Sequence, residues 1–203
     1  LSGTALRPLA ASSVFLLALA GCGGGGSSGD APAPAPPPAP TPVTLTGTVA
    51  VDQAIQNAVV CMDLNANNLC DTGEPASAKT GANGAYSLTY DPAAVAAAQV
   101  AAASLIAPMV PGALTDANTT LDAAEPGVVL AEKAYVLKQV PGKSGQINPL
   151  TTLVAAGIQA GLAENTARTN AAAQLAIAEA KIDNYQDDPV FNETNLVDNA
   201  RLM

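Results

Sequence analysis

The sequence contains no histidine and no tryptophan, and aromatic residues make up only 3% of it. The lack of histidine excludes Ser-His-Asp and Cys-His catalysis, and it excludes zinc or iron sites built on imidazole. The scarcity of aromatic rings argues against a large sugar-stacking platform. These absences favour a role other than catalysis.

Basic residues are also scarce, with 8 Lys and Arg against 17 Asp and Glu, for a net charge of −9. A chain with no basic patch cannot neutralise phosphates, so we expect no nucleic-acid partner. Divalent cations and basic partners are the ligands that this charge favours.

The only long apolar run near the start covers residues 9–20 and follows a single basic residue, Arg7. About a dozen apolar residues are too few to span a bilayer but suit the apolar region of a secretory signal. The run ends in Leu-Ala-Gly-Cys, residues 19–22, which resembles a bacterial lipobox. This resemblance implies a signal peptide over 1–21 and lipidation of Cys22, whereas an ordinary signal or anchor would leave a free cysteine.

If Cys22 is lipidated, the mature chain is an exported lipoprotein whose partner is a membrane, reached through the lipid anchor. Gly23 after the lipidated cysteine is consistent with the bacterial outer membrane, with the periplasmic or surface face undetermined. Residues 22–42 are rich in Gly, Ser, Pro and Ala, which predicts a flexible, disordered linker. This linker would hold a folded domain away from the membrane.

From residue 43 the pattern is first β and then mixed. Residues 43–51, 58–63, 104–110 and 127–140 read as strands, and Asn83-Gly84 predicts a type I′ hairpin. Asp91-Pro92 predicts the start of an alanine-rich helix that runs to about residue 103. Residues 148–203 read as a helical region, in which Asn148 caps and Pro149 opens the first helix.

The last twenty residues show neither periodicity nor a helix terminator. Two interpretations remain open for this segment. The sequence is the front part of a longer protein, or it ends in a frayed tail.

The most informative segment is the polar run from Cys61 to Glu74. Numbered from Asp63, it places oxygen ligands at positions 1, 3, 5, 7, 9 and 12, which is the spacing of an EF-hand-type calcium loop. Asn68 replaces the usual glycine at position 6, but asparagine tolerates the left-handed conformation well. The predicted ligands of a structural calcium ion are Asp63, Asn65, Asn67, Leu69 (through its carbonyl), Asp71 and Glu74.

A second interpretation of this loop needs no metal. Asp and Asn side chains often accept hydrogen bonds from nearby backbone amides and close Asx turns. Under that interpretation the same residues only hold the loop in shape, and both hypotheses stay open from the sequence.

Cys61 and Cys70 bracket the first part of this loop and are the only cysteines left after lipidation. In an exported protein they are expected to form a disulfide, which would close a short ring. A zinc site is the competing interpretation, but two thiols without histidine make a poor closed site.

Residues 47–88 resemble the carboxypeptidase-regulatory-like, transthyretin-like β-sandwich modules, and the calcium loop resembles repeats of bacterial surface adhesins. Residues 147–157 resemble a segment of uncharacterised lipoproteins from Gram-negative bacteria. The resemblance implies a mixed fold: a small antiparallel β-sandwich with a helix insert over 43–147, then the helical region. The module's matching residues are Gly47, Val49, Ala58, Val60, Thr80, Gly84 and Tyr86.

These observations predict a non-enzymatic, lipid-anchored envelope protein with a structural, adhesive or ligand-presenting role toward an unknown envelope or extracellular ligand. One alternative is a hydrolase of envelope polymers that uses Asp116 and Asp122 as paired carboxylates. Another is an accessory module that positions a further domain of a longer enzyme.

Overall fold

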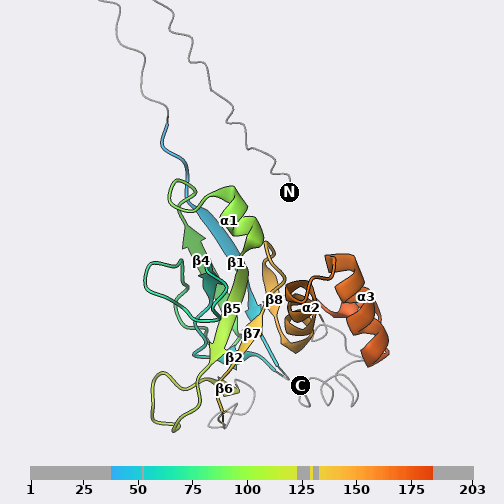
Figure 1. Ribbon diagram of the computed structural model, residues 1–203. Helices are drawn as coiled ribbons and strands as arrows, with labels where there is room; N and C mark the ends of the chain where they lie inside the picture. Colours follow the sequence, from blue (N-terminus) through green and yellow to red (C-terminus); the bar gives the residue numbers. More distant parts are fainter. Residues whose placement is uncertain (1–37, 52, 123–128, 130–132, 185–203) are drawn as a thin grey trace, which may run out of the picture. The chain divides into compact units, whose positions relative to one another are not determined.

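The computed structural model describes residues 38–51, 53–122, 129 and 133–184 (Figure 1). The predicted signal peptide, Cys22 and nearly all of the predicted linker lie outside these residues, as do residues 185–203. The fold is mixed, with most strands preceding the two longer helices, which confirms the predicted fold class.

The first sheet has the strand order β4-β1-β8. Strand β1 (Val43–Val49) pairs antiparallel with β4 (Ala85–Tyr90) from Val43 to Thr48. Tyr86 and Leu88 are buried while their neighbours along β4 are exposed, which is the alternation expected of a half-buried strand. Strand β8 (Gly145–Ile147) lies parallel to β1, so this sheet is not wholly antiparallel.

The β1–β8 pair meets at an unusually close approach. A Cβ added to Gly47 would lie 1.9 Å from the carbonyl oxygen of Gly145, so only glycine fits at this position of β1. The Tyr86 hydroxyl donates to that same carbonyl at 3.0 Å and accepts from the Gly145 amide at 3.2 Å. Three residues far apart in sequence therefore join three strands at one point.

The second sheet has the order β3-β5-β7 and is antiparallel throughout. Its central strand β5 (Ser104–Met109) lies between β3 (Cys61–Asp63) and β7 (Tyr135–Lys138). Two short strands, β2 (Ile55–Gln56) and β6 (Leu121–Asp122), form a separate pair.

The two larger sheets bury one apolar core between them. Alternate side chains of each strand enter this core, while the intervening ones lie on the opposite face of the sheet. The arrangement is that of a small sandwich, as predicted. Its fully or almost fully buried members include Val49, Met62, Leu88, Leu105, Ala107, Met109, Leu137 and Ile147.

The predicted hairpin at Asn83-Gly84 is wrong. Only Gly84 of this pair has a positive φ, 66°, whereas a type I′ turn needs positive φ at both residues. The amide of Gly84 donates to Gly81 at 2.9 Å, and β4 then pairs with β1 rather than with the residues just before the turn. Gly84 also approaches Val49 closely, with the Val49 amide donating to its carbonyl at 2.8 Å.

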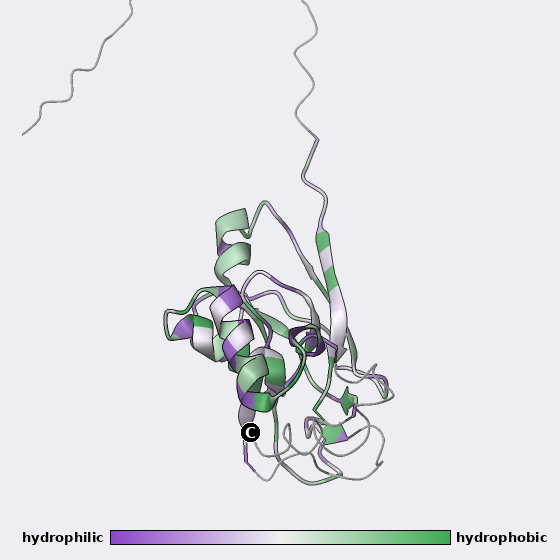
Figure 2. Ribbon diagram, turned by 90° about the vertical axis from the view of Figure 1, so that its right-hand side faces the viewer, coloured by the Kyte–Doolittle hydropathy of each residue, from purple (hydrophilic) through white to green (hydrophobic). Residues whose placement is uncertain are grey.

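The alanine-rich helix α1 (Ala97–Ala102) begins later than the sequence indicates. Asp91 does act as a cap, accepting the amide of Ala93 at 2.8 Å, but it closes only a turn. The chain becomes extended again at Ala96 before the helix starts. Figure 2 shows α1 as almost wholly apolar in composition, as its alanines require.

Helix α2 (Pro149–Gln159) starts as predicted, with Asn148 as its N-cap and proline at the first position. The Asn148 side chain accepts the amide of Thr151 at 2.8 Å. Helix α3 (Glu164–Leu175) and the short 3₁₀ helix η1 (Glu179–Lys181) follow it.

The helices bury a second apolar cluster and are attached to the second sheet. The Lys138 amide donates to the Thr152 hydroxyl at 2.8 Å, and the Thr151 hydroxyl donates to the Lys138 carbonyl at 2.7 Å. These bonds join the end of β7 to the first turn of α2. The cluster contains Val140, Leu150, Val154, Ala167, Ala171, Ala172 and Ile182.

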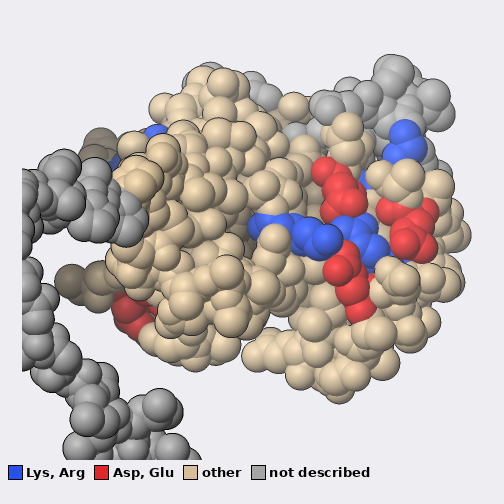
Figure 3. Space-filling view, turned by 90° about the horizontal axis from the view of Figure 1, so that it is seen from above, with Lys and Arg blue, Asp and Glu red and all other residues tan. Residues whose placement is uncertain are grey.

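Ion pairs hold the outer side of α3, and Figure 3 shows acidic and basic side chains meeting on one part of this face. Arg168 binds both carboxylate oxygens of Asp183, at 2.8 and 2.9 Å, and also Glu164 at 3.2 Å. The hydrogen bond to Asp183 raises the pKa of Arg168. The two parallel hydrogen bonds from the Arg168 guanidinium to Asp183 hold the segment after η1 against α3.

Candidate functional site

The polar loop leaves the second sheet at its edge strand β3 and returns to the same strand. The Met62 amide donates to the Pro75 carbonyl at 2.9 Å, and the Ser77 amide donates to Val60 at 2.8 Å. Cys61 and Cys70 form a disulfide with a Cα–Cα distance of 5.6 Å, as predicted. The loop is therefore closed at its base by backbone bonds and across its middle by a covalent bond.

Asp63, at loop position 1, is 4% exposed. Its two carboxylate oxygens accept the amides of Asn67 at 3.1 Å and Asn68 at 3.0 Å. A buried carboxylate is stable only when its oxygens are hydrogen-bonded. The loop folds back over Asp63 and supplies these hydrogen bonds from its own backbone.

Asn65 and Asn67, at positions 3 and 5, each close an Asx turn. Their side-chain oxygens accept the backbone amides two residues further on, at 3.1 and 2.8 Å. Their side-chain nitrogens both donate to one oxygen of Asp71, at 2.8 and 2.7 Å. Positions 3, 5 and 9 therefore meet through amide nitrogens on one carboxylate oxygen, while the amide oxygens accept backbone N–H groups.

Glu74, at position 12, joins the two ends of the loop. One of its oxygens accepts the Leu64 amide at 2.8 Å, and the other accepts the Asp71 amide at 3.1 Å. The Glu74 carboxylate therefore joins Leu64, early in the loop, to Asp71, late in the loop.

The backbone of the loop turns through two left-handed residues. Asn68 has φ of 65°, which confirms that it fills the role of the glycine usual at position 6. Ala66 has φ of 58°, and nothing in the sequence indicates it, because alanine disfavours this region. The bonds of the neighbouring Asx turns impose that conformation on Ala66.

The loop in this form is held by hydrogen bonds from backbone amides to the side chains of Asp63, Asn65, Asn67 and Glu74. Among the described residues, no three His, Cys, Asp or Glu side chains gather as a metal cluster. Each carboxylate oxygen that accepts one backbone amide still has a second lone pair. The oxygen donors match the ligand chemistry of calcium, and within the described part of the chain no group donates to the carbonyl of Leu69 at position 7.

The two acids of the hydrolase alternative lie on different elements. Asp116 is exposed in a turn, where it accepts the Asn118 amide at 2.8 Å. Asp122 is buried in β6, opposite Ile55 of β2.

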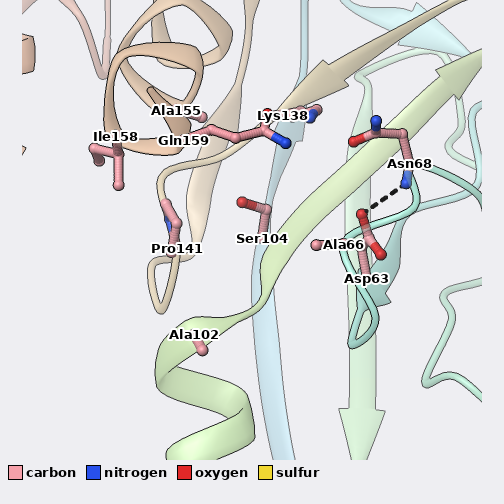
Figure 4. A pocket seen from close by; sticks show the side chains of 10 residues that line it. All are labelled: Asp63, Ala66, Asn68, Ala102, Ser104, Lys138, Pro141, Ala155, Ile158 and Gln159. Carbon is pink, nitrogen blue, oxygen red and sulfur yellow. Dashed lines mark hydrogen bonds between the residues drawn. The ribbon is translucent and has the colours of Figure 1, made fainter. Parts of the chain in front are cut away.

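One feature beside the loop was missed by the sequence analysis. A cavity of about 220 Å³ lies between the loop and α2 (Figure 4), and Lys138, Ser104 and Gln159 line it. The signal was present in the sequence, because Lys138 shares the alternation of Val136 and Val140 and so interrupts an apolar face.

Comparison with known proteins gives no relative: no family model, curated protein or solved structure matches the chain. Among the described residues, no helix has the length and apolarity needed to cross a bilayer.

Proposed function

We propose that this chain is an exported lipoprotein, anchored through Cys22, which displays its β-sandwich and helices on the linker 22–42. Its role is structural, adhesive or ligand-presenting in the bacterial envelope, and not enzymatic. The observation that carries the proposal is the Cys61–Cys70 disulfide, since such bonds persist mainly in oxidising compartments. The lipobox-like sequence before Cys22 supplies the anchor.

We propose further that the loop binds one calcium ion through its six predicted ligand positions, from Asp63 to Glu74. The ion would balance the negative charge that Asp63, Asp71 and Glu74 bring to one loop. Two features support this proposal: the ligand spacing and the left-handed Asn68. Affinity on the order of 10⁻⁴–10⁻³ M, as in extracellular modules, suits a structural ion.

A thermal melt of the purified protein in EDTA and in about 10 mM calcium tests the loop. With a dissociation constant in that range, calcium stabilises the fold by about 1.4–2.7 kcal/mol. For a chain of this length the melting temperature rises by roughly 3–10 °C. Magnesium at the same concentration is expected to give a smaller shift, because it prefers a smaller, octahedral shell.

The variants Asp71→Asn and Asp91→Asn form a matched pair, because each removes one carboxylate charge. Asp91 lies outside the loop and caps a turn, so its variant keeps the calcium-dependent rise. Asp71→Asn is expected to lose most of that rise. Equal shifts in both variants would assign the effect to general charge screening and leave the loop as a hydrogen-bonded turn.

The anchor is tested by expressing the chain in a Gram-negative host fed with an alkyne-tagged fatty acid. The wild-type protein is expected to carry the tag and to enter the detergent phase. Cys22→Ala is expected to do neither. A tagged Cys22→Ala protein, or an untagged wild type, would contradict lipidation at this residue.

A further inference from the structure

We propose that the cavity between the loop and α2 binds a small molecule that carries a carboxylate and a short aliphatic group. The cavity of about 220 Å³ is far larger than the ~10–15 Å³ that one water needs. It is smaller than the roughly 300–1,000 Å³ of pockets for drug-sized ligands. The proposal goes beyond the function above and requires neither calcium nor the lipid anchor.

The carboxylate is inferred from Lys138. This half-buried lysine makes no ion pair within the described part of the chain, although the protein has 17 acidic residues and only 8 basic ones. Its backbone is fixed to the first turn of α2 by Thr151 and Thr152. Lys138 therefore lines the cavity from a backbone position that these two hydrogen bonds hold.

The polar groups of the cavity gather on one side. Figure 4 shows the Gln159 amide of α2 extending toward Lys138, and Ser104 of β5 lining the space with its hydroxyl turned toward Pro141. Asp63 lines the same cavity, but both of its oxygens already accept loop amides. The negative charge of Asp63 is thus partly balanced by these amides, whereas no ion pair among the described residues balances the positive charge of Lys138.

The apolar part of the cavity wall indicates which group the ligand carries beside its carboxylate. Ala102, Pro141, Ala155 and Ile158 are small or aliphatic, and two of these four residues, Ala155 and Ile158, belong to α2. A few converging polar groups with an apolar wall are the usual composition of a small-molecule site. A single aliphatic group of a few carbons matches this wall and the size of the cavity.

Isothermal titration of the purified protein with isovalerate, L-leucine, isopentylamine and inorganic phosphate tests the proposal at constant ionic strength. Isovalerate and leucine share one carbon skeleton and a carboxylate, so saturable binding of either supports the site. Their relative affinities distinguish a free acid from an amino acid as the source of the carboxylate. Binding of isopentylamine alone, equal binding of phosphate, or no saturable binding of any probe would overturn the proposal.

Lys138→Met removes the charge and keeps the side-chain length. It is expected to weaken carboxylate binding on the order of tenfold or more, since a charge-assisted hydrogen bond is lost. Lys133→Met, at an exposed position before β7, is the matched control and is expected to bind as the wild type does.

Should Lys138→Met fail to fold, Gln159→Glu decides the matter, because Gln159 is exposed near the end of α2. A carboxylate placed there would repel the ligand and neutralise Lys138, and it is expected to abolish binding. Unchanged affinity in Gln159→Glu or in a folded Lys138→Met would overturn the proposal.

Discussion

Tyr86→Phe removes one hydroxyl from the point where three strands meet. Tyr86 is 4% exposed, and its hydroxyl bonds both the carbonyl and the amide of Gly145. A buried backbone group that loses its partner costs about 1–3 kcal/mol. Because β8 is a short strand of three residues, we expect a loss of about 2–3 kcal/mol in the free energy of unfolding at pH 7.

The same hydroxyl makes stability depend on pH. Burial raises the pKa of Tyr86 from 10.0 to about 12, although the Gly145 hydrogen bond lowers it. The unfolded chain therefore loses this proton first as the pH rises. The contribution of Tyr86 is fully present below pH 10 and is lost between pH 10 and about 12, amounting to roughly 2.7 kcal/mol.

Urea unfolding of the wild type and Tyr86→Phe, from pH 7 to pH 11.5, measures both effects. The difference between the two proteins should be about 2–3 kcal/mol at pH 7 and should shrink steadily above pH 10. Tyr90→Phe is the control at pH 7, because the Tyr90 hydroxyl makes no hydrogen bond with the described residues. A difference that stays constant up to pH 11.5 would refute the reasoning about burial.

Two further predictions concern the loop and the helical region. Cys70→Ser opens a ring of sequence separation 9 and is expected to cost about 2–3 kcal/mol in non-reducing urea melts. Equal stability of this variant and the oxidised wild type would contradict it. Asn148→Ala removes the cap of α2 and the side-chain bond to the Ile182 carbonyl at 2.9 Å, so a loss of about 2–4 kcal/mol is expected. The same melts check it, with Asn165→Ala in α3 as a control whose loss should stay below about 1 kcal/mol.

Much of the local structure could be predicted from the sequence. The alternation in β1 and β4, the start of α2 at Pro149 and the left-handed Asn68 were all predicted. Each depends on contacts between residues a few positions apart, so a short stretch of sequence contains the information.

The wrong predictions lie where a turn or cap sequence is followed by an element that local sequence does not specify. Asn83-Gly84 indicates a hairpin, but β1 offers β4 a longer paired strand than the residues before the turn do. Asp91 caps only a turn, because the chain extends again at Ala96 before α1. In both places the capping or turn residue was identified correctly, and the element beyond it was not.

In the candidate site, the sequence alone determined the pairing of Cys61 with Cys70 and the left-handed turn at Asn68. These follow from residues within a dozen positions of one another. Only the tertiary structure decided that β8 lies parallel to β1, and that Lys138 faces the loop across a cavity. Such contacts join residues tens of positions apart, and their choice depends on how whole sheets and helices pack, which no local pattern records.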